Sequence, residues 1–159
     1  MDGIEQGVWI VNKTLTEVMD PKFDSPSARI QLLATGLQES KFMDRVQGGG
    51  GPAHSFWQEE PNGIKAVLGH PVVGPILKNI CQKLGVPSDW NSVYQAVVMN
   101  DVLACVVARL ILYADSNPLP KVGDSDAAWQ CYIRNWRPGK PRPATWQGYY
   151  QTAREQINV

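Results

Sequence analysis

Apolar residues recur every three or four positions along most of the chain, and this spacing constrains the fold more than any other feature. The first segment follows it at Ile4, Val8, Val11, Leu15 and Val18 or Met19. Side chains at this spacing share one face of a helix, whereas a half-buried strand needs strict alternation. The sequence therefore predicts a first helix that ends before Pro21, because the residue before a proline disfavours helical backbone.

Capping and breaking residues place the later helices. Ser25 and Pro26 form an N-cap followed by a proline at the first helical position, which predicts a helix over 26–40. Further helices are predicted from Val72 to Leu84, from Pro87-Ser88 to about Met99, from Asn100 or Asp101 to Leu112, from Asp124 or Asp126 to Trp136, and from Pro143 to Ile157. Strand-like alternation and internal repeats are absent from the sequence. We expect one all-α domain over residues 1–159.

Residues 44–63 break the helical pattern. The four glycines Gly48–Gly51 cannot sustain a helix, but they let the backbone approach a ligand closely. Glycine runs also mark flexible linkers, although a linker would not be followed so soon by the large apolar pair Phe56-Trp57. We expect a loop here that contacts a ligand, with a short hairpin as an alternative.

The length suits one domain, which buries roughly 70% of the surface of its unfolded chain. Fifteen basic and fifteen acidic residues cancel, and no long basic stripe indicates a nucleic-acid partner. The one basic cluster is Arg134, Arg137, Lys140 and Arg142. Two interpretations stay open for it, a solvated loop or the rim of a groove that meets an anionic polymer.

Cysteine and histidine usage indicates neither a disulfide framework nor a metal centre. Cys81, Cys105 and Cys131 are odd in number, far apart and within apolar or helical stretches, so buried reduced thiols are expected. His54 and His70 have no Cys or His at ligand spacing. We expect no metal and no cofactor.

The N-terminal residues contain no basic segment followed by an apolar core, so a signal peptide is not predicted. The longest apolar stretch, 102–113, is interrupted by Arg109 and is too short to span a bilayer. We expect a protein made in the cytoplasm without membrane insertion. A substrate in the cell wall would require another agent to deliver it.

Glu39 is the candidate for acid–base chemistry. It lies at the tip of the second predicted helix, on a face shared with Leu32 and Thr35 rather than with charged residues. The negative end of the helix dipole and an apolar wall both disfavour a carboxylate and raise its pKa, as a general acid requires. Phe56 and Trp57 would form the wall if the loop folds back. The alternative is a solvated surface glutamate, the usual fate of a glutamate near a helix end.

The surroundings of Glu39 carry a family resemblance. Glu39 and Ser40 stand at the predicted helix end, Phe42 follows, and Gln58 comes nineteen residues after Glu39. This pattern resembles the soluble lytic transglycosylases of the lysozyme-like superfamily and their phage relatives. In that family a Glu-Ser pair precedes a Gly-Ala-x-Gly-Leu-Met-Gln segment whose glutamine lies about eighteen residues on. Pro52 and Ser55 stand where the family has its two glycines.

The resemblance extends in order over roughly residues 26 to 146. Residues 100–112 and 126–146 resemble two later helices of the family, and Tyr132 is similar to its functional tyrosine, with Tyr113 as a rival. It implies an all-α fold, or at most the α+β arrangement of lysozymes.

The resemblance also implies an activity and a set of site residues. The implied reaction is cleavage of the β-1,4 bond between N-acetylmuramic acid and N-acetylglucosamine in peptidoglycan, with Glu39 as acid and then base. The implied substrate-binding residues are Ser40, Ser55, Phe56, Trp57, Gln58 and Tyr132, with Trp136 as a further residue that could stack on a sugar. Local turn hydrogen bonds are the alternative for the serines, and core packing is the alternative for each tryptophan.

Two other functions stay open. A hydrolytic lysozyme would need a second carboxylate, for which Asp44, Glu59 and Glu60 are candidates, although each is also a plausible solvated loop charge. A non-catalytic virion protein of the same fold could bind glycans or serve a structural role. The expected partner is the peptidoglycan glycan strand, with other virion proteins as further candidates. A phage protein that opens the host wall, at entry or at lysis, fits the resemblance.

Overall fold

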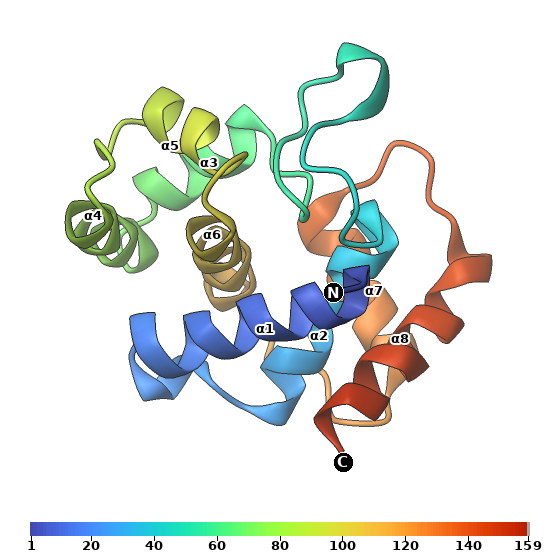
Figure 1. Ribbon diagram of the computed structural model, residues 1–159. Coiled ribbons are helices and arrows are strands. Elements are labelled where there is room, and N and C mark those ends of the chain that lie inside the picture. The colour runs from blue at the N-terminus through green and yellow to red at the C-terminus, as the bar shows by residue number, and fades with distance from the viewer. Residues whose placement is uncertain (159) are drawn as a thin grey trace.

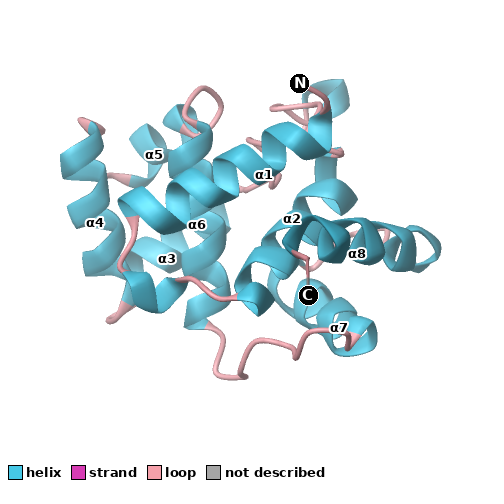
Figure 2. Cartoon of the chain, turned by 60° about the horizontal axis from the view of Figure 1, so that its bottom comes forward, coloured by secondary structure: helices cyan, strands magenta, loops and turns pink. Residues whose placement is uncertain are grey.

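The computed structural model describes residues 1–158, which form eight α-helices and three short turns of other helical pitch. The α-helices are α1 (Gly3–Lys13), α2 (Pro26–Ser40), α3 (Pro61–Gly69), α4 (Val73–Leu84), α5 (Trp90–Ala96), α6 (Asp101–Ala114), α7 (Ser125–Trp136) and α8 (Pro143–Ile157). Within residues 1–158 no strand forms, and β-pairing is limited to isolated bridges of His54 with Val46 and Glu59. The prediction of an all-α fold is confirmed (Figure 2).

The predicted boundaries hold best where a cap or a glycine marks them. Ser25 caps α2 by accepting a hydrogen bond from the Ala28 amide, and Gly85 ends α4 with a φ of 72°. Helix α3 is absent from the predictions, because Pro61, Asn62 and Gly63 at the start of this nine-residue helix are typical of a turn. The first predicted helix changes pitch near its end, since Thr14–Val18 form a π-helical turn.

Helix α6 is the centre of the core. Every residue from Leu103 to Ala108, together with Leu110, has no exposed surface. Helices α1, α2, α3 and α4 all pack against it. In both overall views α3, α4 and α5 lie on one side of the molecule and α7 and α8 on the other, with α1, α2 and α6 between them (Figures 1 and 2).

The C-terminal end of α2 is held in place by close packing around Phe42. A Cβ on Gly36 would lie 2.1 Å from the Phe42 ring and one on Gly7 would lie 2.7 Å from it, so only glycine lets this buried ring fit between α1 and α2. Lys41 and Phe42 both adopt left-handed backbone, with φ of 56° and 55°, which turns the chain away from the helix axis. Glu39 is thereby placed at a rigid helix end.

Among the helices of residues 1–158, none is both long enough and apolar enough to cross a bilayer.

Candidate active site

Glu39 opens into a cavity of about 350 Å³ at the end of α2. One wall comes from the segment after α2, including Asp44, Gln47 and Gln58, and the opposite wall comes from the segment after α7. Figure 1 shows these two segments rising on either side of the end of α2, in teal and orange. The cavity therefore joins three parts of the chain that are distant in sequence.

Tyr132 is the hydrogen-bond partner of the Glu39 carboxyl. Its hydroxyl donates a hydrogen bond to Glu39 Oε2 at 3.1 Å, and the ring is almost fully buried on α7. The rival Tyr113 instead packs edge-on against Phe23, with ring centroids 4.9 Å apart. The structure thus brings Tyr132 to Glu39, but as a buried partner of the carboxyl rather than as an exposed sugar platform.

Burial raises the pKa of Glu39 to about 7, against the opposing effects of the Tyr132 hydrogen bond and the Arg142 charge. The nearby charge of Glu60 adds to the rise. Desolvation was one of the two causes expected from the sequence. A carboxyl with this pKa is protonated about half the time at neutral pH and can act as an acid or a base.

Gln58 stands in the same cavity as Glu39, as the resemblance implies. Its backbone is left-handed, with a φ of 51°, and its side-chain amide donates to the Ser55 carbonyl at 2.9 Å. Ser55 is also left-handed, with a φ of 75°, at a position where the family has glycine. Two strained residues in one short turn indicate that the surrounding contacts determine its shape.

Ser40 and Ser55 hold this turn and are themselves buried. Ser40 Oγ donates to the Phe56 carbonyl at 2.6 Å and accepts from the Phe42 amide. Ser55 Oγ donates to Glu59 Oε1 at 2.9 Å and accepts from the Trp57 amide. Both serines therefore act within the protein, and we do not retain them as substrate-binding residues.

Phe56 and Trp57 lie in the core, with 1% and 0% of their surface exposed. Both rings pack edge-on against Phe42, and Trp57 Nε1 donates to the Leu32 carbonyl at 2.9 Å. A side chain without exposed surface cannot stack on a sugar, so the expected glycan contact of this pair is not retained. The half-buried Trp136, whose ring nitrogen donates to the Trp57 carbonyl, is the aromatic side chain that lines the cavity.

The three candidate second carboxylates fall in different places. Asp44 and Glu60 line the same cavity as Glu39, whereas Glu59 is 3% exposed and borders the neighbouring cavity. Burial raises the pKa of Glu59 well above its usual range, which favours the neutral form of this carboxyl. The charge of Arg142 near Glu39 was not foreseen as part of the site, because the sequence placed it only within a basic cluster.

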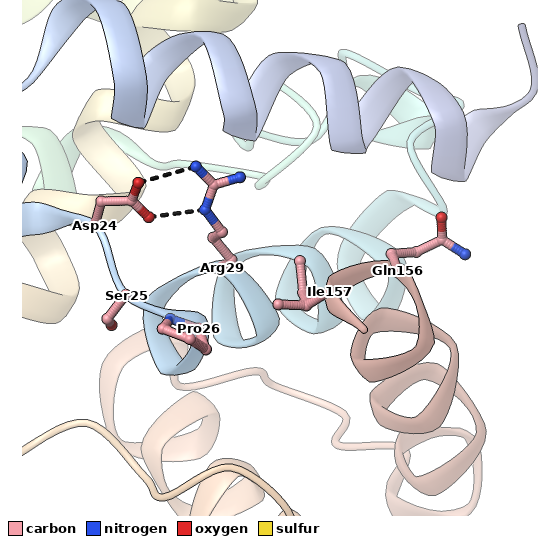
Figure 3. Close-up of a pocket in the computed structure, with 6 residues that line it drawn as sticks. All are labelled: Asp24, Ser25, Pro26, Arg29, Gln156 and Ile157. Atoms are coloured by element: carbon pink, nitrogen blue, oxygen red, sulfur yellow. Dashed lines mark hydrogen bonds and ion pairs between the residues drawn. The ribbon is translucent and has the colours of Figure 1, made fainter. Parts of the chain in front are cut away.

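A separate cavity of about 450 Å³ lies at the opposite end of α2 (Figure 3). Its two charged side chains neutralise each other, because Arg29 makes two hydrogen bonds to the Asp24 carboxylate at 2.7 and 2.9 Å. Arg29 also donates to Asn12 Oδ1. We interpret these contacts as a structural tie between the start of α2 and α1, not as a reactive site.

The cysteines and histidines have structural surroundings. Cys81, Cys105 and Cys131 are buried free thiols, as predicted. His54 stacks on Tyr94 with ring centroids 3.8 Å apart, and His70 Nδ1 accepts from backbone amides at the start of α4.

Comparison with known families, curated proteins and solved structures gave no match for this chain. The fold and the site define an all-α protein with a recessed carboxyl of raised pKa, Glu39, in an open cavity.

Proposed function

We propose that this protein is a lytic transglycosylase that cleaves the β-1,4 bond after N-acetylmuramic acid in peptidoglycan. The observation that carries the proposal is Glu39 itself, a partly buried carboxyl with a pKa of about 7 that accepts a hydrogen bond from Tyr132 and lines one cavity together with Gln58. The resemblance of residues 39–58 to that family supplies the substrate class.

Glu39 would act first as an acid. Its proton moves to the bridging oxygen while the bond from that oxygen to the anomeric carbon breaks, which leaves an oxocarbenium-like sugar and a Glu39 carboxylate. Tyr132 stabilises the carboxylate, because its hydroxyl donates to Oε2. Positive charge from Arg142 acts in the same direction.

Glu39 would then act as a base. The 6-hydroxyl of the same muramic acid attacks the anomeric carbon, and its proton passes to Glu39. One carbon–oxygen bond has broken, one has formed, and the glutamate regains its proton. The reaction therefore consumes no water and needs no second carboxylate.

Hydrolysis is the second candidate, because Asp44 and Glu60 line the same cavity as Glu39. A second carboxylate roughly 6.5–9.5 Å from Glu39 would direct a water molecule to the sugar, whereas one roughly 5–5.5 Å away would attack the anomeric carbon itself and form a covalent intermediate that water then hydrolyses. Peptidoglycan as substrate places the reaction in the bacterial cell wall, and a phage protein released from a virion or at lysis would reach it.

Digestion of purified sacculi with mass spectrometry of the products tests these proposals together. We expect 1,6-anhydro ends, whereas ordinary reducing ends would assign the hydrolytic reaction. Glu39→Gln should lower the rate roughly 10²- to 10⁴-fold, since it removes the only proton donor in the mechanism. Glu155→Gln, an exposed position on α8, is the matched control and should leave the rate unchanged. Binding without any cleavage by the parent protein would indicate a non-catalytic glycan-binding protein.

A further inference from the structure

A second cavity, of about 460 Å³, continues from the Glu39 cavity toward α3. The two cavities share Gln58, Glu60, Trp136 and Arg137 as lining residues. The second one ends against α3 and the end of α6. A substrate bound at Glu39 can therefore extend a branch into it.

The wall of this second cavity holds a buried polar group without a partner. Glu59 is 3% exposed, and while its Oε1 accepts from Ser55, its Oε2 has no hydrogen-bond partner within the described chain. Buried polar atoms are nearly always satisfied, so an orphan oxygen beside a cavity points to a ligand group. Burial raises the pKa of this carboxyl and so favours its protonated form, whose O–H can donate to a carbonyl oxygen.

Two arginines border the cavity, and they differ in what they bind. Arg134 is engaged, since it lies 2.7 Å from Asp115, whose carboxylate also accepts from Asn135. Arg137 ends α7 in left-handed backbone, with a φ of 48°, and its exposed guanidinium has no ion pair or hydrogen bond in residues 1–158. A free guanidinium suits bidentate binding of a carboxylate.

Small and branched apolar side chains complete the lining. Ala66 and Val67 come from α3, and Ile111 and Ala114 come from the last turn of α6. A site with an acid for a carbonyl, a guanidinium for a carboxylate and apolar surface for methyl groups matches a short peptide better than another sugar. Peptidoglycan carries such a peptide on the lactyl group of muramic acid. The lactyl carboxyl is tied up in the amide bond to that peptide, so the free carboxylates of a peptide-bearing strand are those of the peptide.

We propose that the second cavity binds the stem peptide of peptidoglycan, with Arg137 binding a carboxylate of that peptide and Glu59 donating to one of its carbonyl groups. This inference rests on the proposed function, because the peptide reaches the cavity only when its muramic acid lies at Glu39.

The test compares two substrates, glycan strands that keep their stem peptides and the same strands stripped by an amidase, with the lactyl carboxyl that the amidase frees converted to a methylamide. For Arg137→Gln, the preference for peptide-bearing strands, measured as the ratio of the two kcat/KM values, should fall about tenfold or more, as for loss of a charge-assisted hydrogen bond. Lys140→Gln is the matched control, because Lys140 is exposed in the same segment but lines neither cavity. It should leave the ratio unchanged.

A binding measurement separates this inference from the proposed function. Calorimetry with the Glu39→Gln protein should show tighter binding of a disaccharide-peptide than of the peptide-free disaccharide whose lactyl carboxyl is a methylamide, and Arg137→Gln added to that protein should abolish the difference. Equal binding of the two ligands, or an unchanged kcat/KM ratio in Arg137→Gln, would overturn the peptide site while leaving the glycosidic reaction intact. Failure of the parent protein to cleave either strand would overturn the proposed function, and the calorimetry would then decide the peptide site alone.

Discussion

At Glu39 the fold places a carboxyl where its charged form is poorly solvated. Solvation by bulk water is reduced, and one tyrosine hydroxyl and the more distant charge of Arg142 compensate for it only in part. This cost is typical of catalytic groups, since a useful pKa near neutrality is obtained by destabilising the ionised form. The stability of the protein should therefore depend on the protonation of this one residue.

Stability should fall as Glu39 ionises. Because its pKa is about 7 in the folded protein and 4.5 as the ordinary value, the folded state binds the proton more tightly, and the stabilisation is lost as pH rises from about 4.5 through about 7. Glu39→Gln cannot ionise, so its free energy of unfolding should exceed that of the parent by a margin that grows with pH, up to at most about 3 kcal/mol.

Urea denaturation of both proteins at pH 5, 6, 7 and 8 measures this margin. The buried Glu59 is common to both proteins, so its own titration cancels in the difference. A margin that does not change between pH 5 and 8 would show that Glu39 has an ordinary pKa.

On the scale of elements, the end of α2 depends on glycine at position 36. A methyl group there would overlap the Phe42 ring, which is 1% exposed and is held between α1, Phe56 and Trp57. Gly36→Ala should lower the free energy of unfolding by about 1–3 kcal/mol through overpacking. It should also reduce activity by shifting the end of α2, which carries Glu39.

Gly148→Ala in α8 is the matched control for that change. A Cβ at Gly148 meets nothing within 4 Å, so alanine should raise the free energy of unfolding by about 0.5–1 kcal/mol through helix propensity. Chemical denaturation measures the free energy of unfolding of both variants. Equal changes at the two positions would contradict the close packing around Phe42.

The sequence predicted elements well where local chemistry defines their ends and poorly where it does not. Ser25 caps α2, Asn100 caps α6 and Asp124 caps α7, and each cap is visible as a side-chain acceptor before an apolar run. Helix α3 was missed because Pro61-Asn62-Gly63 is typical of a turn, and only packing of Ile64 and Val67 into the core makes the segment helical.

On the scale of the whole molecule, the positions of the three thiols indicate that the helices share a single core. Cys81, Cys105 and Cys131 come from α4, α6 and α7, yet all are free and buried in one apolar cluster. Burial raises the pKa of Cys105 to about 12 and that of Cys131 to about 11, and it also raises the pKa of Cys81.

These thiols should therefore react with a thiol reagent only when the whole molecule opens, because the reactive thiolate is both scarce and inaccessible. We expect native labelling at least about a hundredfold slower than that of Ser88→Cys, an exposed control, with all three cysteines labelled together in urea. Fast labelling of one native cysteine, followed by mass spectrometry, would contradict a single cooperative core.

Local sequence was enough to predict most of the helices, the buried thiols, and Glu39 and Gln58 as candidate site residues, because caps, spacing and motif are local properties of the chain. Tertiary structure alone decided that Tyr132 rather than Tyr113 meets Glu39, that Phe56 and Trp57 serve the core, and that the second cavity exists. Contacts between residues ninety positions apart depend on how α2 and α7 pack, and packing is a property of the assembled core that no short stretch of sequence contains.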